Sequence, residues 1–115
     1  MDTLRWKIVT YETIRGDKPI DEFFKKQQSS TKAKIVHNIR LLQQYGNQLT
    51  LPHAKMLGSG LFELRIRGRE EIRIFFCFAG SNTIHLLHAF KKKTSKTPQR
   101  ELDLAIERMK SLTII

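Results

Sequence analysis

The sequence predicts an α+β fold in which a mainly antiparallel four-stranded sheet packs with a helical hairpin and a C-terminal helix. Two observations support this class. Three apolar segments after residue 60 are joined by short turn-forming connections, and three other segments repeat apolar residues at helical spacing. The expected element order is β-α-α-β-β-β-α. With 115 residues, 40% of them hydrophobic, we expect one domain over residues 1–115.

The N-terminal half begins with a predicted strand and a short helix. Residues 6–11 are rich in β-branched and aromatic side chains, which favour strands. A helix is predicted from near Pro19, because Ile20, Phe23 and Phe24 then share one face.

A longer second helix completes the hairpin. It is predicted to begin among residues 29–31 and to end at Gly46, a residue that commonly terminates helices. Its apolar stripe consists of Ile35, Ile39 and Leu42. Residues 48–59 contain a proline, a glycine and little periodicity, so we expect a connecting loop there.

Three consecutive strands are predicted over residues 61–67, 71–78 and 83–90. The connections at 68–70 and 80–82 are short and rich in turn formers, so an antiparallel meander is the simplest topology. A final helix is expected after Pro98, since proline is favoured at the first helical position. Its apolar positions are Leu102, Ala105, Ile106, Met109 and Leu112.

Charged side chains interrupt these strands at regular positions. Alternation places Glu63, Arg65 and Arg67 on one face of the first strand of the meander, opposite its apolar residues. Arg73 is the single charged residue among residues 72–78 of the largely apolar middle strand, and a lysine run, Lys91–Lys93, follows the third strand. We therefore expect a rigid sheet with clustered positive charge at one end, suited to a polyphosphate ligand.

The formal net charge, 21 minus 11, is +10. Nucleic acid, an acidic protein or an anionic membrane could each bind a chain of this charge. No segment pairs a basic face with exposed apolar residues, as membrane binding requires. There is no apolar run of about eighteen residues and no apolar signal core in residues 1–6, so we expect a cytoplasmic protein. Cys77 is the only cysteine, so no intrachain disulfide can form.

The histidines and the cysteine show no metal-ligand spacing, so a zinc site is not expected. His88 alternates with Leu86 and Phe90, which predicts that the three share one face. A half-buried structural histidine is the favoured interpretation, and a general base is the alternative.

Several segments in order carry a family likeness. They are Gly60-Leu-Phe-Glu-Leu-Arg65, Arg73-Ile-Phe-Phe-Cys-Phe, Leu86-Leu-His-Ala-Phe-Lys-Lys-Lys-Thr94, Lys96-Thr-Pro98, and a helix with Glu101 and Ala105. Together they resemble the HigB-like branch of the RelE/ParE toxin superfamily. The resemblance implies a toxin of a toxin-antitoxin pair, a ribosome-dependent endoribonuclease acting on messenger RNA without metal or other cofactor. It also implies a helix-turn-helix antitoxin as partner.

The resemblance also implies site residues. The expected catalytic residues are Arg65, Arg73, Lys91 and Lys93, and the expected RNA contacts are Glu63, Arg67, Lys92 and Lys96. Some relatives carry a base-stacking tyrosine near the C-terminus, whereas this chain has no tyrosine after Tyr45. In such a site the ribose 2′-hydroxyl attacks the neighbouring phosphate, and cations stabilise the phosphorane.

Alternatives remain open from the residues alone. The chain could be a ParE-like inhibitor of DNA gyrase without nuclease chemistry, or a non-catalytic RNA-binding module. Arg65 could simply pair with Glu63 or Glu71, and the lysine run could be a solvated strand exit.

Overall fold

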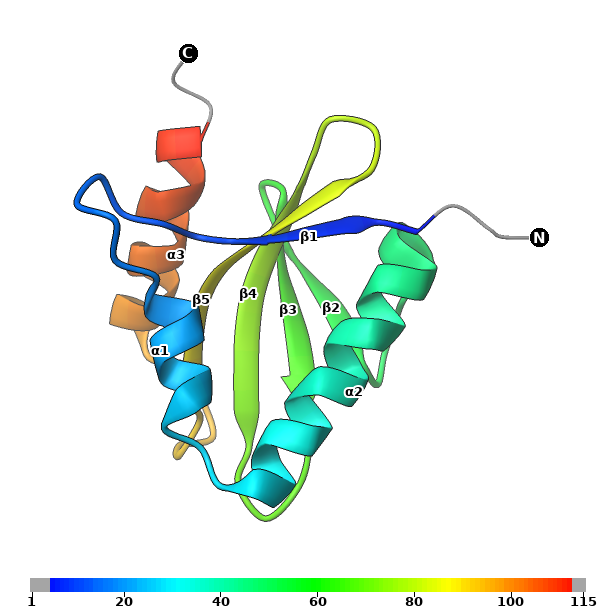
Figure 1. Ribbon diagram of the computed structural model, residues 1–115, viewed down its shortest axis with the longest axis vertical. Helices are drawn as coiled ribbons and strands as arrows, with labels where there is room; N and C mark the ends of the chain where they lie inside the picture. Colours follow the sequence, from blue (N-terminus) through cyan, green and yellow to red (C-terminus); the bar gives the residue numbers. More distant parts are fainter. Residues whose placement is uncertain (1–4, 113–115) are drawn as a thin grey trace.

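The computed structural model describes residues 5–112, so the first four residues of the N-terminal segment considered above lie outside it. The elements are β1 (Lys7–Thr10), α1 (Pro19–Lys25), α2 (Ser29–Tyr45), a 3-10 helix (Gly46–Gln48), β2 (Ala54–Gly58), β3 (Leu61–Ile66), β4 (Ile72–Ala79), β5 (Thr83–Lys91) and α3 (Gln99–Leu112). The α+β class is confirmed (Figure 1). In the described range no helix combines the length and apolar character needed to cross a bilayer.

The sheet has five strands in the order β1-β5-β4-β3-β2. β1 pairs with β5 in parallel, and every other pairing is antiparallel. The prediction of four strands and a loop over residues 48–59 was therefore wrong, since β2 lies within that range. β2 is an edge strand whose only fully buried side chain is Ala54, so it carries no alternating apolar pattern; its backbone pairing with β3 defines it.

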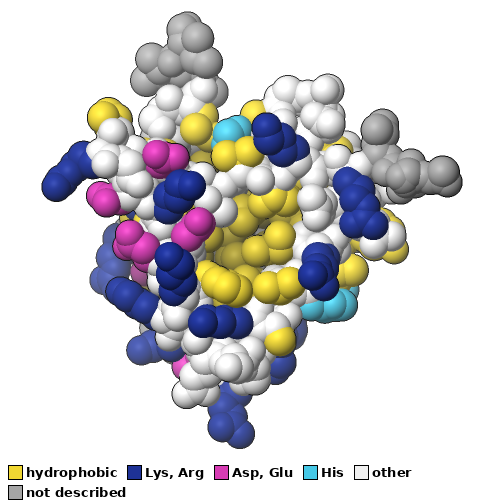
Figure 2. Space-filling model, in the orientation of Figure 1, with side chains coloured by type: hydrophobic (Ala, Val, Ile, Leu, Met, Phe, Trp, Pro, Cys, Tyr) yellow, Lys and Arg dark blue, Asp and Glu magenta, His cyan; other side chains and the backbone are white. Residues whose placement is uncertain are grey.

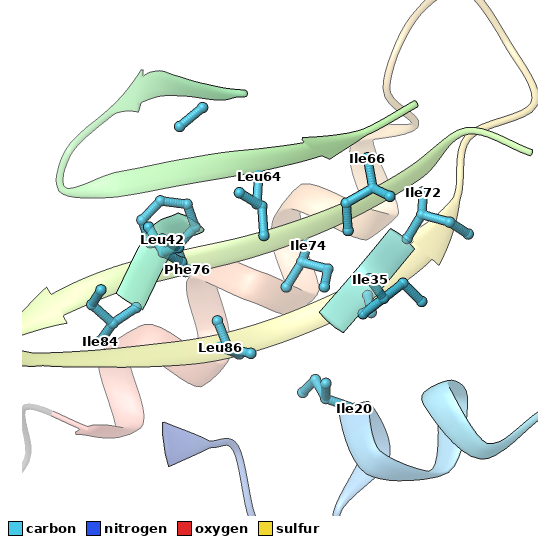
Figure 3. Close-up of a cluster of buried hydrophobic side chains, with 12 residues drawn as sticks. Ile20, Ile35, Leu42, Leu64, Ile66, Ile72, Ile74, Phe76, Ile84 and Leu86 are labelled. Carbon is cyan, nitrogen blue, oxygen red and sulfur yellow. The ribbon is translucent and has the colours of Figure 1, made fainter. Parts of the chain in front are cut away.

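Helices cover both faces of the sheet. One face packs against α1 and α2, which form a V in front of the strands, while α3 lies behind the β5 side (Figure 1). The hairpin-side core, drawn in Figure 3, includes Ile20, Ile35, Leu42, Leu64, Ile66, Ile72, Ile74, Phe76, Ile84 and Leu86. The core on the α3 side consists of Leu61, Phe75, Cys77, Leu87, Phe90 and Ala105. β4 is thus buried on both faces over residues 72–77, which fits its near-continuous apolar sequence.

A β-bulge changes the register of β5. Phe76 pairs with Leu86, whereas Phe75 pairs with His88, so Leu87 is an extra residue in the ladder. Leu86 belongs to the hairpin-side core, while His88 and Phe90 lie on the α3 side. The prediction that His88 shares a face with Leu86 was wrong, because an inserted residue reverses the alternation beyond it.

The start of the sheet is anchored to the end of α2 by Trp6. Its backbone N–H donates to the Gln43 carbonyl at 3.0 Å, and its indole packs edge-on against Phe78 with ring centroids 5.1 Å apart. Gly46, which ends α2, has φ +52°, and a Cβ at this position would overlap the indole. The glycine that the sequence marked as a helix stop is therefore also required by this contact.

Candidate active site

Arg65 and Arg73 lie directly opposite each other on β3 and β4. Directly paired residues project from the same face of a sheet, and here that face is the α3 side. Glu63 lies two residues before Arg65 on β3, so its side chain leaves the same face. The expected alternation of Glu63 and Arg65 is confirmed, and Arg73 joins them from the neighbouring strand.

Glu63 bridges the two arginines. Its Oε1 lies 3.3 Å from Nε of Arg65, and its Oε2 lies 3.4 Å from Nη1 of Arg73. A second carboxylate, Glu71, accepts a hydrogen bond from Nη2 of Arg73 at 3.2 Å. Two cations and two anions therefore form one network, in which the charge of each arginine is offset by a neighbour.

The two arginines differ in accessibility. The Arg73 side chain is 7% exposed and Glu63 4%, whereas Arg65 is 22% exposed. Nε and Nη1 of Arg73 and Nε of Arg65 have no hydrogen-bond acceptor among residues 5–112, although ion-pair contacts to Glu63 are close. All three atoms are inaccessible to solvent, so a ligand could contact only the exposed part of the Arg65 side chain. Arg65 is the more exposed guanidinium, and Arg73 is the buried one on the neighbouring strand.

The lysine run does not converge as a unit on the arginines. Lys91 pairs with Ile72 in the register, which places it on the hairpin side, and its ammonium contacts Glu70 at 3.0 Å. The ammonium of Lys92 donates to the carbonyls of Thr94 and Ser95 at 2.8 and 2.9 Å, so it braces the following loop.

The remaining predicted RNA contacts lie at one end of the sheet. β3 and β5 run in the same direction, because each is antiparallel to β4. Arg67, which follows β3, and Lys93 and Lys96, which follow β5, are therefore exposed near the same end. These cations form a rim rather than part of the Glu63 network.

Sequence reasoning missed Lys55. This exposed residue of β2 pairs with Glu63 in the register and so leaves the same face. Because β2 itself was not predicted, nothing in the local pattern marked Lys55 as a neighbour of the arginines.

Sequence reasoning also missed the pairing of His88 with Glu101, thirteen residues further along the chain. Nε2 of His88 lies 2.5 Å from Oε1 of Glu101 in the first turn of α3, and the imidazole stacks on Phe90 with centroids 5.5 Å apart. Phe90 pairs with Arg73 across β4 and β5. The bulge at Leu87 thus brings a titratable ring to the arginine face.

A five-stranded, mostly antiparallel sheet with three α-helices is consistent with a RelE-like fold. The chain belongs to the Gp49-like family of phage-derived proteins (DUF891), whose model matches residues 22–110. That family is a toxin-antitoxin-type toxin family among the RelE/HigB-like toxins, so an antitoxin partner is implied. A search of the curated proteins finds no match to this chain.

Proposed function

We propose that this protein is a cytoplasmic, HigB-like toxin that cleaves translated messenger RNA on the ribosome without a metal ion. The observation that carries the proposal is the direct pairing of Arg65 with Arg73 on one face, joined by Glu63, with the Arg65 side chain partly exposed to solvent. Paired guanidinium groups match the oxygens of a phosphodiester in geometry and charge. A gyrase inhibitor that acts by protein contact would not require them.

The proposed reaction is an intramolecular transesterification. The ribose 2′-oxygen attacks the adjacent phosphorus as its proton is removed, the bond to the 5′-oxygen breaks, and that oxygen is protonated. The products are a 2′,3′-cyclic phosphate and a 5′-hydroxyl end. Arg65 contacts the phosphate and stabilises the phosphorane, while Arg73 adds positive charge and Glu63 orients both arginines.

Proton transfer is assigned to His88 in this proposal. It lies on the arginine face, two register pairs along from Arg73, and Glu101 holds its ring. Lys93, which the resemblance marks as catalytic, instead holds the RNA backbone together with Arg67, Lys92 and Lys96. Lys91 is given no part at the arginine face, because it leaves the opposite face and contacts Glu70.

The test is to map transcript ends after brief induction of wild type, Arg65→Ala and Arg15→Ala. We expect codon-linked cuts with cyclic phosphate ends for wild type, and a rate lower by about two to three powers of ten for Arg65→Ala. Arg15 is an exposed cation in the turn before α1, so Arg15→Ala should cleave like wild type. Fragments with 3′-hydroxyl ends, or equal cleavage by all three proteins, would contradict the mechanism.

The same induction separates the competing functions. DNA damage with intact messages would indicate gyrase inhibition, and neither effect together with RNA binding would indicate a non-catalytic module. We further propose that the implied antitoxin is a small helix-turn-helix protein encoded by the adjacent reading frame.

A further inference from the structure

A hydrogen bond from α3 holds the β-bulge of β5. Leu87 is the extra residue in the ladder between β4 and β5, and a bulged residue is left without its regular backbone partner. Leu87 is completely buried, so water does not reach its carbonyl. A buried carbonyl without a partner is costly. Nη1 of Arg108 supplies the partner, because it donates to the Leu87 carbonyl at 2.8 Å.

The Arg108 guanidinium is also fixed by the residue that follows β1. Its central carbon lies 5.0 Å from the centroid of the Tyr11 ring, within the range of a cation–π contact. The backbone N–H of Tyr11 donates to the carbonyl of Leu86, the residue before the bulge, at 2.9 Å. Arg108 and Tyr11 therefore contact each other and hold two consecutive carbonyls of β5.

The bulge decides which face of the sheet carries His88. In an uninterrupted strand His88 would share the hairpin side with Leu86, since side chains alternate. Between α1 and α2 that side presents an apolar surface, to which a titratable ring is poorly suited (Figure 2). With the bulge, Leu87 and His88 both lie on the α3 side, and Nε2 of His88 reaches Oε1 of Glu101.

α3 contacts both the bulge and the histidine. Glu101 and Arg108 are seven residues apart, about two turns, so they lie on one side of the helix. Ala105, between them, is fully buried in the core on the α3 side. The carbonyl that Arg108 holds belongs to the peptide group joining Leu87 to His88. The same side of α3 thus fixes the His88 backbone through Arg108 and the His88 ring through Glu101.

We infer that Arg108 is a positioning residue for proton transfer. By holding the Leu87 carbonyl it keeps the bulge, and through the bulge it keeps His88 on the arginine face. The inference rests on the proposed function, in which His88 transfers the proton. Arg108 is given no contact with RNA, so its loss should lower kcat and leave KM nearly unchanged.

The experiment measures cleavage by Arg108→Met and wild type on ribosomes programmed with a messenger RNA. Methionine keeps an unbranched apolar stem but has no donor for the Leu87 carbonyl. We expect kcat to fall at least about tenfold, because small displacements of a reacting group are costly, with KM within about twofold. Arg108→Lys restores a donor and should recover most of the lost rate. Arg15→Met, the same exchange at an exposed arginine before α1, should cleave like wild type.

Two readouts separate positioning from a general loss of stability. Adding Arg108→Met to His88→Ala should slow cleavage by less than about twofold beyond His88→Ala alone, because the group that Arg108 positions is already absent. In the isolated protein, the nitrogen NMR signals of the His88 ring should move in Arg108→Met to their positions in Glu101→Ala, since the contact with Glu101 is lost.

Thermal unfolding checks that each variant is folded. Where Arg108→Met does not fold, Tyr11→Leu takes its place. This variant removes the aromatic ring that contacts the guanidinium, and we expect a rate about threefold lower, with the same dependence on His88.

Wild-type cleavage, or unchanged His88 signals, in the folded variant would overturn the inference. An equal loss of rate with and without His88 would also overturn it, because Arg108 would then act on another step. A wild-type chain that cuts no RNA would refute the proposed nuclease. The His88 signals are recorded without RNA, so in that case their shift in Arg108→Met still supports the positioning of the ring, and no shift overturns it.

Discussion

At the scale of single residues, Glu63 determines the state of the candidate site. It is nearly inaccessible to solvent and its two oxygens face different guanidinium groups. A buried charge is tolerated only when partners compensate it, so Glu63 and Arg73 depend on each other. Glu71 also pairs with Arg73 but is 38% exposed, and water can replace it.

This difference gives a prediction for two matched substitutions. Glu63→Gln should destabilise the fold by about 3 kcal/mol, since Arg73 then keeps a buried charge with one exposed carboxylate partner. Glu71→Gln should cost less than about 1 kcal/mol. Denaturant unfolding of both variants measures the difference. Equal losses would show that Glu63 is not the principal partner of Arg73.

His85 gives a pH dependence of stability. It pairs with Cys77 across β4 and β5, and burial lowers the pKa of its imidazole below the usual 6.5. The unfolded chain therefore binds this proton more readily than the folded one. The contribution of neutral His85 is complete above about pH 6.5 and is lost as pH falls below it. We expect His85→Gln to lose less stability than wild type between pH 7 and 5 in parallel unfolding curves. If the free energy of unfolding of wild type and His85→Gln changed with pH by the same slope, His85 would be excluded as a source of this dependence.

At the scale of elements, the end of α2 and the beginning of β1 form one joint. Position 46 accepts no side chain, because Trp6 occupies the space that a Cβ would need. Gly80, in the β4–β5 turn, also has a positive φ, of +64°, but nothing lies within 4 Å of a Cβ added there. A comparison of alanine substitutions at the two glycines therefore separates the cost of steric overlap from the cost of backbone strain.

Gly46→Ala should therefore destabilise the protein by about 3 kcal/mol or more, through both backbone strain and displacement of the indole. Gly80→Ala should cost only the strain, about 1 kcal/mol. Thermal and denaturant unfolding compare them, and Trp6 fluorescence reports displacement of the ring. Similar losses in both variants would mean that the contact with Trp6 contributes nothing.

The contact between His88 of β5 and Glu101 of α3 attaches this helix to the sheet near the candidate site. A double-mutant cycle with His88→Ala and Glu101→Ala should give a coupling energy of about 1 kcal/mol or more, because both side chains are largely buried. The pair Gln99 and Asp103, joined at 2.9 Å on the exposed surface of α3, should couple by only about 0.3 kcal/mol. A cycle energy near zero for His88 and Glu101 would contradict their role in docking α3.

At the scale of the whole molecule, the charge of +10 is distributed unevenly. The arginines of the site are offset by Glu63 and Glu71, and exposed cations surround them at the strand ends. The rim should attract a polynucleotide over a distance, while the network inside provides short-range contacts.

A salt titration with a short single-stranded RNA tests this division. If about four phosphates are contacted, affinity should fall roughly 50-fold between 50 and 200 mM salt. Replacing the rim residues Arg67 and Lys93 by Gln should make the log-log slope shallower by about 0.7 for each lost contact. Replacing Lys18, an exposed residue before α1, should leave the slope unchanged. Affinity independent of salt would exclude an electrostatic RNA interface.

Much of this protein follows from local sequence. Two-residue and helical periodicities predicted the helical hairpin, three strands, the final helix and the shared face of Glu63 and Arg65, because each depends on residues a few positions apart. Tertiary structure alone decided the rest. Backbone pairing made β2 a strand beside Glu63, the bulge at Leu87 turned His88 towards α3, and folding brought Arg73 to share one carboxylate with Arg65. Such features depend on which distant segments become neighbours, and no repeat within a single segment records that.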